Sequence, residues 1–256
     1  MRVACVEWPE NLSPAHRAWD EITKSVAAAR PDLLLTNELP FGPWIAAAPE
    51  FSTDAADRSI RAHEEGLAAL IGLRLRAIIS TRPVWNGSRL ANEAFVLENG
   101  ATRALHRKQY FPNEPGWFES EWYAGDNSGF EIAEILGIKV GVLICTEAMF
   151  NEQARAYGKQ GAALIVIPRA TGKNLVPWKI AAAMASVVSG AYVISSNRAG
   201  SATVGPNFGG TGFAYAPQAA PLGITTAAAP LQTFDLDPLT AQAAQREYPC
   251  YVPERT

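Results

Sequence analysis

Cysteine and histidine are scarce in this sequence. Each occurs three times among 256 residues, and neither a C-x-x-C nor an H-x-x-x-H spacing is present. Because protein zinc sites are usually built from such closely spaced pairs, no metal site is expected. Three cysteines cannot all pair with one another, which favours a reducing, cytoplasmic compartment.

Long apolar runs and runs of like charge are also missing. No uncharged apolar segment reaches the roughly 18 residues that a membrane span needs, and the opening MRVACVEWPE resembles a strand rather than a secretory signal. The formal net charge of −3 argues against nucleic acid or an anionic membrane as the main partner. What the sequence does have is a hydrophobic fraction of 48% and seven tryptophans, enough for a substantial core.

Short β-rich segments alternate with longer helical ones. Helices are predicted over 13–29, from 53 into the low seventies, over 147–160 and over 175–189, the first two capped by Ser13 and Thr53. Strands are predicted at 3–8, 33–38, 77–85, 91–100, 101–107, 130–135, 138–145, 163–168, 191–196, 210–217 and 230–237.

Two hairpin signals interrupt this alternation, at Asn99-Gly100 and at Leu136-Gly137. Strand–helix units combined with hairpins favour mixed sheets covered by helices, which is an α/β fold. No internal repeat and no long linker divides the chain. We therefore expect a single domain over 1–256, with a C-terminal tail from about residue 238.

Reactive residues stand where three of the predicted strands end. Glu38 closes LLLTNE, Lys108 follows ATRALHR, and Cys145 closes IKVGVLIC. In α/β folds, ligands bind outside the carboxyl ends of strands. A carboxylate that takes the thiol proton, a thiolate that attacks and an ammonium that stabilises an acyl oxygen are suited to acyl transfer. A pair of Cys145 with His106 is the alternative, and a buried, inert cysteine is the plainest reading of Cys145 taken alone.

Three longer segments carry a resemblance to a known family. They are LLLTNELPFG around Glu38, LHRKQYFPNEPGWFESEWYAGD around Lys108, and VGVLICTEAMFNEQARAYGKQGAALIVIP around Cys145, in that order. With them, the chain resembles the nitrilase superfamily of carbon–nitrogen hydrolases over nearly its whole length. The resemblance implies a four-layer αββα sandwich, no cofactor, and pairing of two sandwiches into a homodimer.

The same resemblance implies roles for particular residues. Glu38 would be the general base, Lys108 the oxyanion stabiliser, Cys145 the nucleophile, and the backbone N–H of Thr146 a second oxyanion donor. Many members carry a second glutamate between the lysine and the cysteine. Glu119 fits that position best, and Glu114 or Glu121 are the alternatives because the following spacing is one residue short.

Substrate-binding residues are suggested by position alone. Aromatic residues crowd the loops after Glu38 and Lys108, and Trp117 is the one we expect in the pocket. Arg169, just past a predicted strand, could anchor a substrate carboxylate or form a surface ion pair. For the homodimer, the helix over 147–160 and the C-terminal tail are expected at the interface, because the helix carries small residues, Ala154, Ala156 and Gly158.

The residue after the cysteine bears on the reaction. Nitrilases in the strict sense carry Cys-Trp-Glu, whereas this chain has Cys-Thr-Glu at 145–147. It therefore resembles the amidase and N-carbamoyl hydrolase branches. The expected activity is hydrolysis of a small primary amide or N-carbamoyl compound to carboxylate and ammonia through a thioester. Nitrile hydrolysis by the same residues and a non-catalytic binding role are the alternatives.

Overall fold

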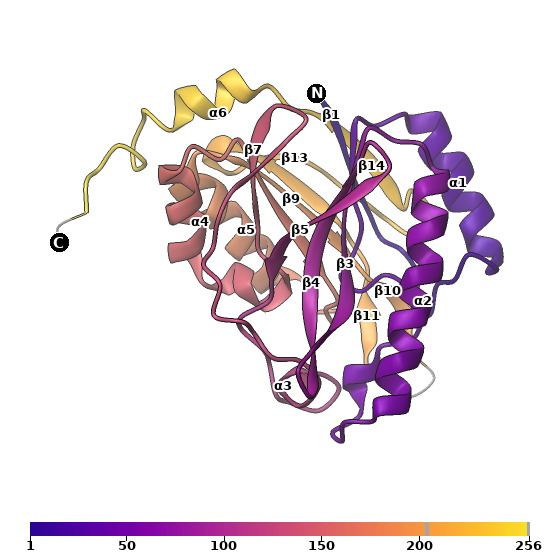
Figure 1. Cartoon of the computed structure of the whole chain (residues 1–256). Helices are drawn as coiled ribbons and strands as arrows, with labels where there is room; N and C mark the ends of the chain where they lie inside the picture. Colours follow the sequence, from indigo (N-terminus) through magenta and orange to yellow (C-terminus); the bar gives the residue numbers. More distant parts are fainter. Residues whose placement is uncertain (203–204, 255–256) are drawn as a thin grey trace.

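Two mixed β-sheets stack face to face, and helices cover both outer faces (Figure 1). This architecture is seen in a computed structural model, which describes residues 1–202 and 205–254. Within those residues, each of the two large sheets has six strands. The fold is the predicted α/β sandwich with four layers, αββα.

The first sheet has the strand order β14-β1-β2-β3-β4-β5. Strands β1, β2 and β3 are parallel, and antiparallel strands extend the sheet on both sides. Because β5 is two antiparallel pairings away from β3, it runs in the same direction as β2 and β3. The strands are β1 (Arg2–Val6), β2 (Leu33–Leu35), β3 (Ala77–Asn86), β4 (Arg89–Glu98), β5 (Ala101–Arg107) and β14 (Leu231–Asp235).

The second sheet has the order β13-β12-β9-β8-β7-β6, again with three parallel strands, β7 to β9, in its middle. Its strands are β6 (Ala133–Ile135), β7 (Ile138–Val142), β8 (Leu164–Arg169), β9 (Tyr192–Asn197), β12 (Phe213–Ala216) and β13 (Ala220–Ile224). A separate two-stranded ribbon joins β10 (Ala199–Ser201) to β11 (Asn207–Gly209). The sequence-based prediction did not include β10, β11 and β13.

Helices supply the outer layers. α1 (Arg17–Ala29) and α2 (Thr53–Gly72) lie on the first sheet, whereas α4 (Asn151–Lys159) and α5 (Val176–Ser189) lie on the second (Figure 1). α3 (Glu119–Trp122) is a single turn in the long loop after β5. α6 (Pro238–Ala244) occupies the start of the segment expected as a tail, and Ala241 and Ala244 on it are buried. The described residues also include 3₁₀ turns at Ile45–Ala47, Cys145–Met149 and Pro217–Ala219.

The core lies between the two sheets because the central strands are apolar on both faces. In β1, Val3 and Cys5 face the second sheet, whereas Ala4 and Val6 face the helices. β2 repeats the pattern, with Leu34 turned toward the helices. Such alternation follows from the two-residue period of a strand.

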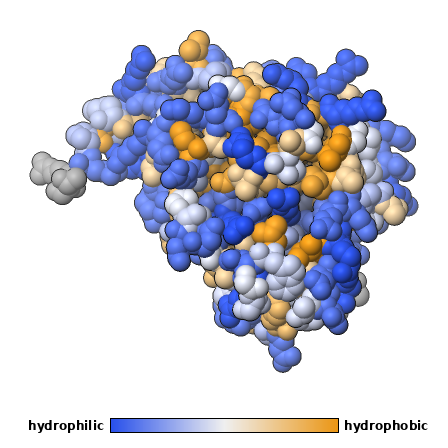
Figure 2. Space-filling model, viewed as in Figure 1, coloured by the Kyte–Doolittle hydropathy of each residue, from blue (hydrophilic) through white to orange (hydrophobic). Residues whose placement is uncertain are grey.

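At the β5 and β6 edge of the sandwich, Leu105, Ala133 and Leu136 are only partly buried against the core between the sheets. Figure 2 shows apolar residues reaching the surface on this face, with polar residues over most of the rest. The core between the sheets therefore extends to that edge.

Element ends differ from the prediction in places that matter for the site. α1 is capped by the His16 ring rather than Ser13, and α2 by Ser52 rather than Thr53. The strands predicted to end at Glu38 and Cys145 stop three residues earlier. The backbone turns there, with positive φ at Leu39 and Cys145, so both reactive residues lie in loops beyond their strands.

Candidate active site

Loops that follow strands of both sheets meet at one end of the sandwich. Glu38 follows β2 and Lys108 follows β5, two strands of the first sheet that run in the same direction. Cys145 follows β7 of the second sheet. The backbone N–H of Glu38 donates to the carbonyl of Arg169 at the end of β8, 3.2 Å away, which joins the two sheets directly beside the site.

Lys108 connects two carboxylates in a fully buried cluster. Its Nζ donates to Oε1 of Glu38 at 2.9 Å and to Oε2 of Glu119 at 2.6 Å, and all three side chains are inaccessible to solvent. Asn92 on β4 also donates to Glu38 Oε1, at 2.8 Å. The other oxygens, Glu38 Oε2 and Glu119 Oε1, are buried and receive no hydrogen bond from the described residues. Each carboxylate therefore keeps one oxygen that could serve a reacting group.

Charge and burial act against each other in this cluster. Burial disfavours the charged form of Lys108, but Glu119 and Glu38 outweigh it and hold the pKa of the lysine well above 10.5. Burial also raises the pKa of Glu119 from 4.5 to about 8, with Lys108 opposing the rise and Glu38 adding to it. The lysine is therefore a permanent cation shared between two carboxyl groups.

The structure separates the three glutamates of the loop after Lys108. Glu119 opens α3 and is the one that contacts the lysine. Glu114 is exposed and lines a pocket instead, and Glu121 accepts a hydrogen bond from Asn113 at 3.1 Å. Of the three loop glutamates, Glu119 is therefore the one that the structure brings to Lys108.

Cys145 opens the 3₁₀ turn after β7 with a φ of 51°, and its side chain is buried. Burial raises the pKa of its thiol well above 9.0, with Glu38 adding to the rise and Lys108 opposing it. At neutral pH the thiol is therefore protonated, and it needs a base to become a nucleophile.

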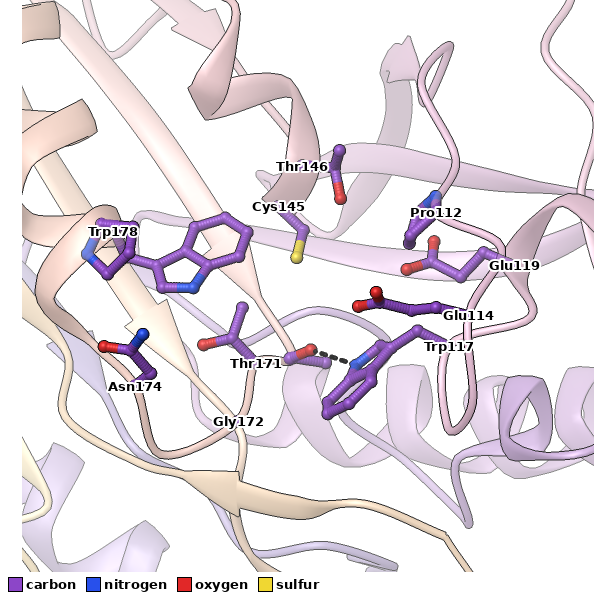
Figure 3. A pocket seen from close by; sticks show the side chains of 12 residues that line it. Pro112, Glu114, Trp117, Glu119, Cys145, Thr146, Thr171, Gly172, Asn174 and Trp178 are labelled. Carbon is purple, nitrogen blue, oxygen red and sulfur yellow. Dashed lines mark hydrogen bonds between the residues drawn. The ribbon is translucent and has the colours of Figure 1, made fainter.

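A pocket of about 250 Å³ opens over Cys145. Figure 3 shows the sulfur facing this space, with Trp178 on one side and Glu114 and Glu119 on the other. Thr146 also lines it; in the first turn of a helix, backbone N–H groups have no partner within the helix. The remaining lining residues are Pro112, Trp117, Ala170, Thr171, Gly172, Asn174 and Pro177.

Trp117 forms part of the pocket wall, where the sequence placed it. Its indole Nε1 donates to the carbonyl of Ala170 at 3.0 Å, so the ring is tied to the loop after β8 (Figure 3). Trp178, near the start of α5, stands on the second-sheet side of the same pocket. Apolar walls around a few polar groups are the usual make-up of a small-molecule site.

Arg169 lies elsewhere than expected. Its side chain is fully buried, does not line the pocket, and donates to Ser195 Oγ at 2.6 Å and to Thr171 Oγ1 at 2.9 Å. A third bond reaches the carbonyl of Thr211 at 2.9 Å. Burial lowers the pKa of Arg169 from 12.5 to about 10. This geometry disfavours both interpretations of Arg169, the substrate anchor and the surface ion pair. The side chain instead holds Thr171, which lines the pocket, by a hydrogen bond.

Several residues at the site were not found by sequence reasoning. Asn92 lies on β4 and reaches Glu38, but asparagine in a predicted strand carries no signal of such a contact. Thr171 and Asn174 line the pocket from an irregular loop. His106 contacts Glu147 rather than Cys145, at 2.9 Å, so the alternative pairing of Cys145 with His106 is wrong.

Among residues 1–202 and 205–254, no group of three or more histidine, cysteine or acidic side chains is arranged to hold a metal ion. No helix in that same part of the chain has the length and apolar character to cross a membrane.

Fold and site together define a class: αββα sandwich proteins that bury a carboxylate–ammonium–carboxylate cluster near a pocket-facing thiol. The family model described as carbon-nitrogen hydrolase matches residues 4–246 of this chain. The protein belongs to the carbon-nitrogen hydrolase family.

Similar proteins include N-carbamoylputrescine amidase of Solanum lycopersicum, 32% identical over 89 residues, which are 35% of this chain and 30% of that protein. A glutamine-dependent NAD(+) synthetase of Xanthomonas campestris is 29% identical over 182 residues, 67% of this chain and 31% of that protein. The chain thus spans about 30% of the length of these curated relatives.

Solved structures share the fold at low identity. A carbon-nitrogen hydrolase from Helicobacter pylori G27 superposes with a TM-score of 0.86 at 18% identity, covering 100% of this chain and 95% of that one. An amidase from Nesterenkonia sp. gives a TM-score of 0.75 at 20% identity, covering 94% of this chain and 92% of that one.

Proposed function

We propose that the protein is a cysteine-dependent hydrolase of non-peptide carbon–nitrogen bonds in small molecules. Its substrate would be a primary amide, cleaved through a thioester to a carboxylate and ammonia, or an N-carbamoyl compound, cleaved through a thiocarbamate to ammonia, carbon dioxide and an amine. The observation that carries this proposal is the buried cluster of Glu38, Lys108 and Glu119 beside the pocket-facing thiol of Cys145. Burying a lysine between two carboxylates costs desolvation free energy, and titratable groups in such environments are enriched at functional sites.

Acylation follows from the charges in the cluster. The protonated thiol of Cys145 gives its proton to Glu38 as the sulfur attacks the amide carbonyl. The carbonyl oxygen becomes an oxyanion, which the ammonium of Lys108 and the backbone N–H of Thr146 stabilise. Glu38 then passes its proton to the departing nitrogen, which leaves as ammonia.

Deacylation uses the same base. Water gives a proton to Glu38 and attacks the thioester, and the oxyanion forms again beside Lys108 and Thr146. When it collapses, the carbon–sulfur bond breaks and Glu38 returns the proton to the thiolate. The carboxylic acid product leaves and ionises to a carboxylate. No cofactor and no metal takes part in this proposal.

Two other functions fit the same fold. Nitrile hydrolysis would begin with attack on the nitrile carbon to give a thioimidate, but Thr146 stands where strict nitrilases carry tryptophan. A binding protein without catalysis would have no use for a buried lysine shared by Glu38 and Glu119. A panel of primary amides, N-carbamoyl compounds and nitriles, scored by ammonia release, separates the three. Release from nitriles alone, or from none of the panel, would contradict the proposal.

Substrate charge gives a first prediction. The charged side chains that line the pocket in the described chain, Glu114 and Glu119, are both acidic. Neutral amides with branched or aromatic acyl groups should therefore react faster than small amides or carbamoyl compounds that carry a carboxylate. Glu114→Gln should raise kcat/KM for a carboxylated substrate about fivefold, because two like charges a few ångströms apart in water repel by about 1 kcal/mol.

The control for this prediction is Glu121→Gln, which changes a glutamate of the same loop that bonds to Asn113 outside the pocket. It should leave both classes of substrate unaffected. Wild-type protein that prefers carboxylated substrates would contradict the prediction.

We also propose a homodimer, with α5 rather than α4 at its centre. Ala154 is fully buried within the chain, and a side chain at Gly158 would clash with the backbone of Ser189 on α5, 2.5 Å away. Ala154 and Gly158 therefore serve packing inside the chain, which removes part of the reason for placing α4 at the centre of the interface.

An apolar stripe on α5 supports the new assignment. Val176, Ile180 and Met184, four residues apart, are 64%, 63% and 47% exposed. Ile180→Glu should convert a dimer into a monomer in light scattering at micromolar concentration, because a charge would be buried at the interface. The matched control is Ile71→Glu on α2, an exposed isoleucine on the opposite outer layer. A dimer that survives Ile180→Glu would place the interface elsewhere.

We also propose a cytoplasmic compartment and a single domain. Cys5, Cys145 and Cys250 are all free thiols, which agrees with a reducing, cytoplasmic setting. We further propose that 1–256 acts as one carbon-nitrogen hydrolase domain, because the two sheets share a single core.

A further inference from the structure

Glu147, two residues after Cys145, carries a buried carboxylate that the mechanism above does not use. It is fully inaccessible to solvent and does not line the pocket. Its oxygens nevertheless accept hydrogen bonds from three separate donors. They are the backbone N–H of Ile144 at 2.7 Å, the backbone N–H of Gln109 at 2.7 Å, and Nε2 of His106 at 2.9 Å.

The donors lie on both sides of the reacting residues. Ile144 directly precedes Cys145, and Gln109 directly follows Lys108. Lys108 continues from β5 of the first sheet and Cys145 from β7 of the second, and no strand ladder joins these two sheets in the described chain. One carboxylate therefore ties the backbone beside the lysine to the backbone beside the nucleophile, across the interface between the sheets.

Capping of its own helical turn does not account for these contacts. A cap needs only the bond from Ile144, which precedes the 3₁₀ turn. The bonds from Gln109 and His106 reach a different sheet, and bonds from N–H groups to a carboxylate are among the stronger hydrogen bonds in proteins. His106 is itself held by the ring of Phe130, with centroids 4.9 Å apart.

We propose that Glu147 is a positioning residue that fixes the separation between the thiol of Cys145 and the ammonium of Lys108. This inference rests on the proposed function, because that separation matters only if both groups act on one substrate atom. The attacked carbon and its oxygen must lie between the two groups. A misplacement of about 1 Å in such an arrangement can cost about 10²-fold in rate.

Glu147→Gln tests the proposal because it keeps the shape and changes one oxygen into an NH₂ group. The amide can accept from Ile144 or from Gln109, but its NH₂ group then faces the other backbone N–H, which has no acceptor. We expect kcat for a neutral amide to fall about 10–10²-fold, with KM changed less than about threefold, since the pocket wall is untouched.

A second readout separates positioning from general damage. Alkylation of Cys145 by iodoacetamide needs the thiol and its base but no oxyanion stabiliser. The alkylation rate should therefore stay within about threefold in Glu147→Gln, while single-turnover acylation falls. Glu147→Asp, which keeps both acceptor oxygens on a shorter side chain, should show a smaller loss, and it serves as the test if the glutamine variant does not fold. Glu152→Gln, an exposed glutamate on α4, is the matched control.

The outcomes are distinct. If the wild-type protein releases no ammonia from any amide or carbamoyl compound, the proposed function fails. If the wild type is active and the Glu147 variants keep full kcat, or lose alkylation in proportion to acylation, the positioning role is overturned. A fall in kcat with preserved alkylation supports it.

Discussion

Cys145→Ala should abolish ammonia release without unfolding the protein. The substitution removes one sulfur atom at the floor of the pocket, a change comparable to losing one methylene, which costs about 1 kcal/mol of stability. It also removes the only atom that the mechanism joins covalently to the substrate. Loss of such a nucleophile lowers kcat by about 10⁴–10⁶-fold. Turnover of a neutral amide, with circular dichroism and thermal unfolding alongside, measures both effects.

Cys250→Ala is the control for this result, since Cys250 lies outside the active-site pocket and is only half-buried. It should retain full activity. Retained activity in Cys145→Ala would remove the basis of the proposed mechanism.

Alkylation extends the test of Cys145 to its base. Because burial holds the pKa of the thiol well above 9.0, this cysteine needs a base that takes its proton before it can react. Iodoacetamide should label Cys145 in the wild type only with the help of Glu38, and much more slowly in Glu38→Gln. Cys250, half-exposed, should react at the same rate in both proteins. Equal labelling of Cys145 in the two proteins would assign the base elsewhere.

At a pH above about 8, where Glu119 is ionised, Glu119→Gln should slow acylation by about 10²–10³-fold, the range for loss of one preorganised electrostatic group. Glutamine keeps the shape and one oxygen for Lys108, but it removes the charge that balances the ammonium. Glu38→Gln should be worse, because no acceptor for the thiol proton then remains. Single-turnover kinetics with a neutral amide compares the variants directly.

The pH dependence gives this prediction a second measurement. Burial raises the pKa of Glu119 to about 8, so its carboxyl group is mostly protonated at pH 7 and ionises as pH rises through about 8. If the ionised form supports Lys108, acylation in the wild type should increase with pH across that range. Glu119→Gln cannot ionise and should lack this increase. An identical pH profile in both proteins would contradict the supporting role.

Two neighbouring glutamates serve as controls. Glu121→Gln should be silent, because Glu121 bonds to Asn113 outside the pocket. Glu114→Gln should slow acylation of a neutral amide far less than Glu119→Gln. If acylation is strongly slowed in Glu114→Gln or Glu121→Gln, a loop glutamate other than the one bonded to Lys108 supports the reaction.

The layers of the fold were predictable because the central strands are apolar on both faces. Runs such as 33–35 and 164–167 leave no polar face for solvent, so sheets buried between helices and each other were the natural prediction. Element ends were less predictable. Ser13 has the right chemistry for a cap, but the His16 ring accepts the hydrogen bond from the backbone N–H of Ala18 at the start of α1. Propensity alone does not show which of several neighbouring residues will be the N-cap.

The site was predictable where residues follow apolar strands and not where they follow loops. Glu38, Lys108 and Cys145 each come shortly after a strand, and the first two meet in the structure as expected. Glu119 fitted best, but Glu114 and Glu121 stayed as alternatives, because the segment between Lys108 and α3 has no periodicity that shows which side chains face the lysine. The partners of Arg169 were hidden for a different reason. Ser195 and Thr211 are distant in sequence and are brought together only by the second sheet.

The pairing of β1 with β14 has a consequence for how the protein acquires its activity during synthesis. Arg2 lies opposite Asp235, so β1 has a neighbouring strand on both sides only after β14 has been made. Contacts of such long sequence separation form slowly. While a ribosome is still making the chain, β1 has an open edge, and exposed strand edges promote association with other chains. Newly made protein should therefore gain hydrolytic activity only after residues 231–235 have left the ribosome, and chain termination before residue 231 should yield aggregation rather than a smaller active enzyme.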